Sequence, residues 1–431
     1  MTVDEQRTTE AQLALDRYVR SMRRPRLLYA GAIAAVVVVI VGLVAFAWSG
    51  SEVAHTTLHT AAAPAPSVAL QAPSPTLSAS WQSTDHAAIG TPYWGGTVIT
   101  YSTHSVRGRN ASTGAIVWSY TRTDRTVCAA IQVQGVTTAL FEHGGNCDEA
   151  TGLDSGTGKR KWTRTFDMDG HPLDGHPAYS VGQYTVMLTT PKVIYAFDPS
   201  GGLNRWDFAQ TGCSINSAVL GSAGALISQT CVHPKCDGLT FCGSGPQLLL
   251  RDGTAGHSDD DKDKANPDQI KWDLIGNPAV PASADQLISA LDPSSSKLVV
   301  LDVTKGATLH RLDVRSIDTT GIAQFASARA ELLWIGGYTY SVELTGAAYF
   351  WTTPTASPLT VTQAIGELPT SVPDLSHVIV AVASSSGIAV LDAGTGKVSK
   401  TYPVQVLPAG ASVYPFGSGF LVAGTSSAMY R

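Results

Sequence analysis

The amino-acid sequence predicts an all-β protein, an eight-bladed β-propeller preceded by one transmembrane helix. A short motif returns along the chain, strand-like runs precede its copies, and one long apolar run lies near the N-terminus. In the clearest copy, residues 152–162, Gly158 follows Asp154 by four residues and Trp162 follows it by eight. The same spacing recurs, complete or in part, at Asn110, Gly114 and Trp118; Asp198, Gly202 and Trp206; Asp302, Gly306 and His310; Val342, Gly346 and Phe350; and Asp392, Gly396 and Lys400.

This motif indicates a strand, a tight turn and a second strand. Asp or Asn opens such a turn by accepting hydrogen bonds from backbone amides two residues on. Glycine takes the position with positive φ, which costs other residues most. Upstream of Asp198, residues 184–188 and 193–197 are rich in β-branched and aromatic side chains, as strands are. Each repeat is therefore expected to form a small antiparallel sheet.

The repeat spacing and the two ends of the repeat region predict the number of blades. Asn110, Asp154 and Asp198 follow one another at intervals of forty-four residues, a period typical of propellers. Residues 77–81 resemble an outgoing strand alone, while residues 413–430 supply up to three strands without an outgoing partner. A blade shared between the ends would close the ring and remove exposed sheet edges. Seven anchored repeats and this shared blade make eight blades. Seven blades is the alternative, if the weak repeat at Val342 or the closing blade is merged with a neighbour.

At these residues the chain resembles the PQQ-like (quinoprotein-type) β-propeller family, whose repeat reads roughly Ala-x-Asp-x-x-Thr-Gly-Lys-x-x-Trp. Residues 152–162 and 196–206 match it best, and the resemblance extends from about Leu77 to the C-terminus. It implies that each aromatic residue docks between neighbouring blades, which is a structural role. The expected docking residues are Trp81, Trp118, Trp162, Trp206, Trp272 and Phe350.

The N-terminal region predicts a membrane anchor. Residues 27–48 form an apolar run without charge, long enough to cross a bilayer core of ~30 Å. Five arginines lie within the ten residues before the run, and none follows soon after it, so we expect residues 1–26 to be a cytoplasmic tail and the remainder to lie outside the cytoplasm. A cleavable signal peptide is the alternative, although its apolar part is usually shorter.

Residues 49–76 are rich in Ala, Pro, Ser and Thr, a composition typical of a linker with no core of its own. We expect this segment to act as a stalk. The propeller itself is predicted to occupy residues 77–431.

The six cysteines favour an oxidising compartment. Cys128 and Cys147 lie nineteen residues apart, and Cys213 and Cys231 lie eighteen apart at equivalent positions of another repeat. We therefore expect these pairs to form disulfides, which leaves Cys236 to pair with Cys242. The alternative is a metal site made of Cys231, His233, Cys236 and Cys242.

Two loops carry side chains that could bind metal ions. Residues 257–268 separate Asp252 and Gly256 from the aromatic Trp272 of the same repeat, and they are rich in Asp. They lack the spacing of a helix–loop–helix calcium site, so we expect a solvated loop. His171 and His176 could offer two imidazoles, but a polar loop between blades is the favoured interpretation.

Function is predicted in broad terms only. A net charge of −5 gives no electrostatic reason to expect nucleic acid binding. The first hypothesis is a scaffold in the bacterial cell envelope that binds envelope or secretion proteins, and the second is a sensor of an envelope ligand. A quinoprotein dehydrogenase ranks third, because the resemblance implies adjacent cysteines for that activity and the sequence has none. We therefore expect no catalytic residue, cofactor or metal.

Overall fold

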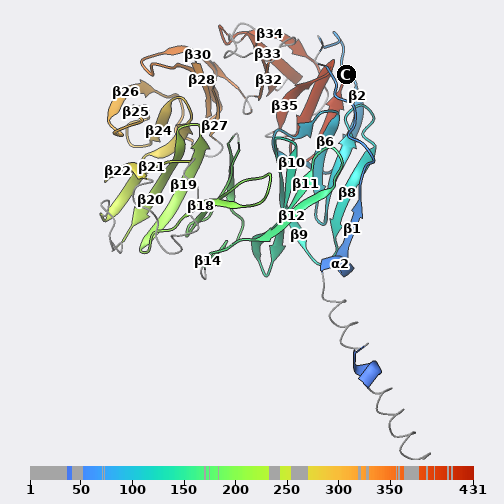
Figure 1. Cartoon of the computed structure of the whole chain (residues 1–431). Helices are drawn as coiled ribbons and strands as arrows, with labels where there is room; N and C mark the ends of the chain where they lie inside the picture. Colours follow the sequence, from blue (N-terminus) through green and yellow to red (C-terminus); the bar gives the residue numbers. More distant parts are fainter. Residues whose placement is uncertain are drawn as a thin grey trace, which may run out of the picture. The chain divides into compact units, whose positions relative to one another are not determined.

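The computed structural model describes residues 36–40, 52–69, 71, 73–168, 171–173, 175–182, 184–232, 243–253, 270–318, 322–326, 330–355, 357, 360–363, 378–384, 387–392, 394–404, 407–408 and 411–431. The chain divides into two units, Met1–Thr57 and Leu58–Arg431. In the second unit, β-sheets succeed one another along the chain, as in a β-propeller (Figure 1). The predicted all-β class is confirmed.

Most sheets contain four strands that pair antiparallel in sequence order. The first sheet is formed by β3 (His86–Ala87), β6 (Thr97–Ser102), β7 (Ser105–Asn110) and β8 (Ile116–Arg122), with β5 (Tyr93–Trp94) paired to β6. The second is formed by β9 (Thr126–Val133), β10 (Val136–His143), β11 (Asn146–Asp154) and β12 (Arg160–Thr165), with β4 (Ile89–Gly90) paired to β9. A small hairpin follows, β13 (Asp167–Met168) and β14 (His171–Pro172).

The next sheets repeat the four-stranded pattern. The third contains β15 (Ala178–Val181), β16 (Val186–Thr189), β17 (Ile194–Phe197) and β18 (Asn204–Phe208). The fourth contains β19 (Cys213–Gly221), β20 (Gly224–Cys231), β21 (Gly245–Arg251) and β22 (Ile270–Ile275). The fifth contains β23 (Val280–Ala284), β24 (Ile288–Asp292), β25 (Lys297–Leu301) and β26 (Thr308–Asp313).

Two further sheets precede the closing one. The sixth contains β27 (Ala323–Ala326), β28 (Ala330–Ile335), β29 (Tyr338–Glu343) and β30 (Tyr349–Pro354). The seventh contains β31 (Thr360–Gln363), β32 (Val378–Ser384), β33 (Gly387–Asp392) and β34 (Val398–Tyr402). First strands of neighbouring sheets contact each other, as β15 does β19, β19 does β23 and β31 does β35, so the first strands form the inner edges of the sheets.

The last sheet joins the two ends of the repeat region. Three C-terminal strands, β35 (Ser412–Phe416), β36 (Gly419–Ala423) and β37 (Ser427–Tyr430), pair in order, and β2 (Ala79–Ser83) adds to β37. Trp81 lies opposite Met429 in this pairing, and β2 lies beside the C-terminus in Figure 1. The N-terminal strand therefore completes a sheet begun at the other end, as the sequence predicts.

The turn of the repeat is closed by hydrogen bonds to its opening Asp, as expected, although the carboxylate of Asp154 accepts from the amide three residues on and not two. Oδ1 of Asp154 accepts from the backbone N–H of Thr157 at 2.8 Å, and Gly158 N–H donates to Asp154 O at 2.7 Å. Gly158 has a φ of +72°. Beyond the turn, Gly152 pairs with Trp162 but Leu153 pairs with Arg160, so the register shifts by one residue. The shift accommodates the turn and leaves the indole of Trp162 buried.

Part of the expected linker packs against the propeller. The backbone N–H of Ala61 donates to Thr157 O at 2.9 Å, and that of Gln71 donates to Gly417 O at 2.8 Å. Pro64 lies beside Gly156, one residue before Thr157 in the same turn. Residues 58–71 thus differ from the expected free stalk, because their backbone groups find partners in turns of the second and closing sheets.

The first sheet carries an insertion between β3 and β6 that reaches the inner edges of other sheets. In it, β4 runs parallel to β9, and Tyr414 of β35 donates from its hydroxyl to Gly90 O at 3.2 Å. The ring of Tyr93 packs edge-on against Phe416, with 4.9 Å between centroids. Residues 88–94 therefore connect the inner strands of the second and closing sheets.

Of the predicted membrane segment, residues 27–48, the structure describes residues 36–40, which are helical. No helix among the described residues is long and apolar enough to cross a membrane. The predicted tail, residues 1–26, lies outside the described part of the chain. The short helix α2 (Glu52–His55) precedes β1 (Thr56–His59).

Candidate functional site

Tryptophan side chains join neighbouring sheets by one recurring hydrogen bond. Nε1 of Trp118 donates to Ser155 O at 3.0 Å, and Nε1 of Trp162 donates to Pro199 O at 2.8 Å. Each acceptor directly follows the Asp that opens the next turn. The equivalent bonds are Trp81 to Ala111 at 2.9 Å, Trp206 to Gly253 at 3.2 Å and Trp272 to Val303 at 3.1 Å. The aromatic residues of the motif are therefore used structurally in this part of the chain.

The turn glycines lie against these indoles. A Cβ atom on Gly158 would lie 2.7 Å from the ring of Trp118, and one on Gly202 would lie 2.5 Å from the ring of Trp162. Gly202 has a φ of +67°. Glycine is thus required twice over, for the backbone conformation and for the close approach of the ring.

In the sixth sheet, Trp351 and not Phe350 takes the docking position. Phe350 is 50% exposed, whereas Trp351 is 8% exposed and its ring lies 2.4 Å from the Cβ position of Gly396. Trp351 pairs with Ser341 just before the register shift, as Trp162 pairs with Gly152. The prediction for Phe350 was wrong because the count began one residue too early: Trp351 follows Glu343 by eight residues, as Trp162 follows Asp154. Gly346 N–H donates to Glu343 O, three residues back, so the turn opens at Glu343 and not at Val342.

The junction between the fifth and sixth sheets has no indole at the docking position, where the sequence places His310. There Gly346 packs against Val300. A buried carboxyl group also joins these sheets, because Oε2 of Glu331 accepts from the backbone N–H of Leu287 at 3.0 Å. Burial raises the pKa of Glu331 to about 8, so the group holds its proton at neutral pH.

Two of the predicted disulfides are present. Cys128 bonds to Cys147 and Cys213 bonds to Cys231. The second bond removes Cys231 from the alternative metal site. The other members of that site, His233, Cys236 and Cys242, lie outside the described residues, as do the acidic residues 257–268.

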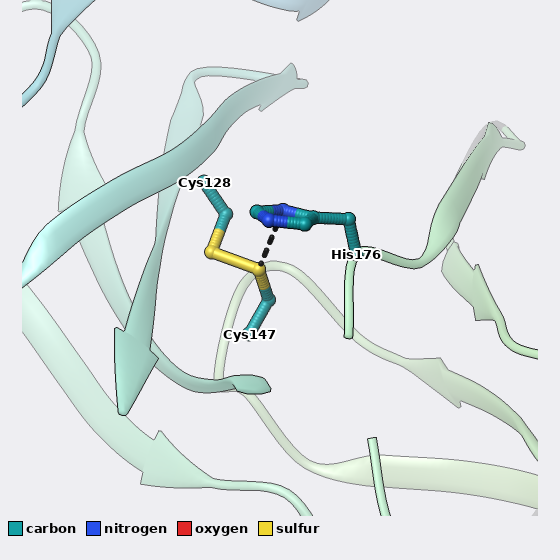
Figure 2. Close-up of side chains that lie close together, drawn as sticks. All are labelled: Cys128, Cys147 and His176. Carbon is teal, nitrogen blue, oxygen red and sulfur yellow. Dashed lines mark hydrogen bonds between the residues drawn. A yellow bond between two sulfur atoms is a disulfide. The ribbon is translucent and has the colours of Figure 1, made fainter. Parts of the chain in front are cut away.

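One disulfide has a histidine beside it. Nδ1 of His176 lies 3.3 Å from Sγ of Cys147, and the ring lies beside the disulfide (Figure 2). The three potential ligand atoms of Cys128, Cys147 and His176 lie within 4.8 Å of one another. Because the sulfurs are bonded to each other, they offer no thiolate to a metal ion. The side chain of His171, the other imidazole considered from the sequence, is not described.

A charged cluster occupies the same end of the second sheet. The Arg122 guanidinium is almost fully buried and pairs with Asp124, at 2.9 Å, and with Glu149. Arg125 lies 3.4 Å from Glu149. The hydrogen bond from Arg122 lowers the pKa of Asp124 to about 2. Burial by itself would lower the pKa of Arg122, but its bonds to Asp124 and Glu149 outweigh this and raise it. The cluster is thus neutralised internally.

Sequence reasoning missed a second buried ion cluster near β2. Asp85 accepts hydrogen bonds from Arg107 at 2.9 Å and from Arg109 at 2.7 Å. Burial by itself would raise the pKa of Asp85, but the two arginines hold it below its ordinary value. The distance in sequence between Asp85 and these arginines follows no recurring pattern. The cluster therefore becomes visible only when β6 pairs with β7.

A groove of about 560 Å³ lies between the fourth and fifth sheets. Asp273, Asp292 and Arg311 line it, and Arg311 lies 3.5 Å from Asp292. Burial raises the pKa of Asp273 to about 6. This groove holds polar groups of both charges and could take a small solute.

These features define a β-propeller in which aromatic residues of a repeated motif fasten each sheet to the next. A family model described as "Outer membrane protein assembly factor BamB" matches residues 68–220 and 148–402. The chain therefore belongs to the PQQ-like β-propeller repeat family, as its motif predicts.

Solved structures similar to this chain include other propellers. BamB from Moraxella catarrhalis is 15% identical, with a TM-score of 0.45, over 84% of this chain and 99% of that one. The C-terminal WD40 domain of Sif2 is 11% identical, with a TM-score of 0.49, over 83% and 98%. The computationally designed Ika8 protein is 12% identical, with a TM-score of 0.49, over 80% and 100%. No curated protein sequence matches the chain.

Proposed function

We propose that this protein is a membrane-anchored, extracytoplasmic β-propeller of eight blades that acts as a protein-interaction scaffold in the bacterial cell envelope. Residues 27–48 would anchor it, with residues 1–26 in the cytoplasm. Its partners would be envelope or secretion proteins. Membership of a family described as an outer membrane protein assembly factor supports this proposal.

The observation that carries the proposal is the structural use of the repeat residues. The turn carboxylate of Asp154 accepts hydrogen bonds within its own turn, and the indole N–H of Trp162 donates its hydrogen bond to the next sheet. The recurring Asp and Trp of the motif thus make structural contacts that build the frame of the propeller. A frame of this kind presents loops at fixed positions, which suits recognition of other proteins.

Eight blades are supported by the sheets that the described residues form. Seven sheets of at least four strands follow one another from β3 to β34, and the sheet of β35, β36, β37 and β2 is the eighth. The bond from Trp81 to Ala111 then fastens the closing sheet to the first.

Binding of a small envelope ligand is the second candidate function. The groove lined by Asp273, Asp292 and Arg311 favours it, since the groove combines a half-buried carboxyl with an ion pair. A propeller that binds a solute there would act as a sensor and would need a cytoplasmic partner for its short N-terminal tail.

Cross-linking in intact cells tests the scaffold. Photo-reactive residues would replace exposed side chains such as Trp94 and Leu203 in the full chain, with a version ending at Pro75 as the control. We expect envelope proteins to be captured only by the full chain and at a subset of the positions. Equal capture by the version ending at Pro75, or no capture together with solute binding by the purified protein, would reject the scaffold. Protease treatment of intact cells should degrade the propeller if it lies outside the cytoplasm.

A further inference from the structure

The Cys128–Cys147 disulfide differs from the Cys213–Cys231 disulfide by the imidazole beside it. Sγ of Cys147 lies 3.3 Å from Nδ1 of His176. A disulfide sulfur carries no hydrogen, so Nδ1 must be the donor in this contact. Sγ of Cys231, by contrast, lies 3.4 Å from Oε1 of Gln247, an atom that cannot donate a proton.

Backbone bonds hold His176 in this place. The N–H of Gly175 donates to Oδ1 of Asn146 at 3.0 Å, and the N–H of Cys147 donates to Gly175 O at 3.2 Å. Gly175, the residue before His176, is thus tied twice to the segment that carries the sulfur. The imidazole is exposed to solvent, so it can exchange its proton with water.

The two sulfurs are not equally accessible. Cys147 is fully buried, whereas Cys128 is partly exposed. An external thiolate would therefore reach Cys128, and Cys147 would be the leaving group. The imidazole lies against the sulfur on which negative charge would develop (Figure 2).

We propose that Cys128–Cys147 is a thiol–disulfide exchange site for an external dithiol. His176 acts as the general acid that protonates Sγ of Cys147 when this sulfur leaves. The thiolate of the reductant attacks Sγ of Cys128, and a new S–S bond forms as the Cys128–Cys147 bond breaks. The electron pair passes to Sγ of Cys147, which takes the Nδ1 proton of the His176 imidazolium and leaves a neutral imidazole that keeps its proton on Nε2. The second thiol of the reductant then attacks the mixed disulfide, leaving two cysteine thiols here and a disulfide in the reductant.

Several charged groups on the surrounding elements belong to ion pairs, whereas Glu142 of β10, the strand between β9 and β11, has no ion pair among the described residues. Asp124 precedes β9 and pairs with Arg122, and Glu149 of β11 pairs with Arg122 and Arg125. Asp148 of β11 is the remaining acid next to Cys147 in sequence and makes contacts of its own. His176 is the titratable group in contact with Sγ of Cys147, so we assign the pH dependence of the exchange rate to it.

The test is the rate at which dithiothreitol reduces each disulfide in the full-length oxidised protein, with alkylation and mass spectrometry of the cysteine peptides. Rates are divided by the thiolate concentration at each pH. We expect Cys128–Cys147 to react faster than Cys213–Cys231, on the order of tenfold, because a stabilised leaving thiol speeds exchange. The corrected rate should fall as the pH rises, because fewer molecules then carry the proton that His176 gives to Cys147.

Variants distinguish this role from a structural one. His176→Gln should slow Cys128–Cys147 and make its corrected rate independent of pH, while Cys213–Cys231 remains unchanged as the internal control. His59→Gln replaces another exposed histidine and should alter neither rate. With the monothiol glutathione, the mixed disulfide should form on Cys128. Equal rates for the two disulfides, a His176→Gln protein with the wild-type pH profile, or an adduct on Cys147 would each overturn the proposal.

Discussion

Trp162 and Pro199 are joined by a hydrogen bond of 2.8 Å from the indole Nε1 to the backbone carbonyl oxygen. The two residues lie in neighbouring sheets, and the ring is buried with Phe197 and Leu140 in one apolar cluster. Directional and apolar interactions therefore act at the same junction. Because each such ring is fastened to the next sheet, the loss of one should weaken the frame on both sides.

Replacement of the Trp162 ring should destabilise the protein strongly. Trp162→Ala should lower the free energy of unfolding by about 3 to 5 kcal/mol, as large buried side chains do. Trp162→Phe keeps most of the apolar contact and should cost about 1 kcal/mol for the lost hydrogen bond. Urea unfolding measures both. Leu203→Ala is the control, since that side chain is 61% exposed, and a similar loss there would contradict the docking role.

Two glycines with similar backbone conformations should respond differently to alanine. Gly202 (φ +67°) and Gly144 (φ +61°) both have positive φ, so both substitutions carry the cost of that conformation, about 1 kcal/mol. A Cβ on Gly202 would also lie 2.5 Å from the Trp162 ring, whereas nothing lies within 4 Å at Gly144. We expect Gly202→Ala to lose roughly 1 to 3 kcal/mol more. Equal thermal destabilisation would show that the ring can move aside.

Two adjacent aromatic residues of the sixth sheet should differ in how much stability is lost when each is replaced by alanine. Trp351 is buried against Gly396, while Phe350 is half exposed. Trp351→Ala should cost about 3 to 5 kcal/mol, and Phe350→Ala should stay within about 1 kcal/mol of the wild type. Denaturant midpoints of the two variants provide the comparison. A larger loss for Phe350→Ala would restore the residue that the motif spacing favours.

Glu331 should make stability depend on pH. Burial raises its pKa from 4.5 to about 8 in the folded state. Between these values the folded protein binds more protons than the unfolded chain, so stability falls as the pH rises through this window. The contribution of the neutral carboxyl is fully present below the lower value and is lost above the higher one. Other titrating groups contribute as well, so the wild type must be compared with a variant.

Glu331→Gln provides that comparison, because an amide keeps an acceptor for the Leu287 N–H but does not ionise. Thermal unfolding would be followed from about pH 5 to about pH 9. The variant should gain stability relative to the wild type towards the alkaline end. Parallel pH profiles for the two proteins would mean that Glu331 does not ionise in this range.

Local chemistry made much of the fold predictable. The Asp154 turn forms from residues within five positions of one another, so its hydrogen bonds follow from the sequence alone. The period of the motif predicted the succession of sheets. The lone strand that carries Trp81 and the three C-terminal strands without an outgoing partner predicted the closing sheet, because an open sheet edge is unfavourable.

The failures have physical reasons as well. The position of Phe350 was chosen by counting from Gly346, but in this repeat the turn opens at Glu343 and the glycine stands one residue earlier within the turn, so the docking position falls on Trp351. Residues 58–71 look like a free linker in composition, yet the backbone N–H of Ala61 finds an acceptor at Thr157. Such contacts depend on which turns lie nearby in space.

The repeat, its turns, the family and the pairing of Cys128 with Cys147 could be predicted from the sequence, because each depends on residue types at fixed short spacings. The position of His176 beside Cys147 and the burial of Glu331 at the junction where His310 stands in place of an indole depend on the packing of the sheets. Those placements arise when separate sheets pack, since burial and contact across a junction depend on the positions of whole strands and not on local spacing.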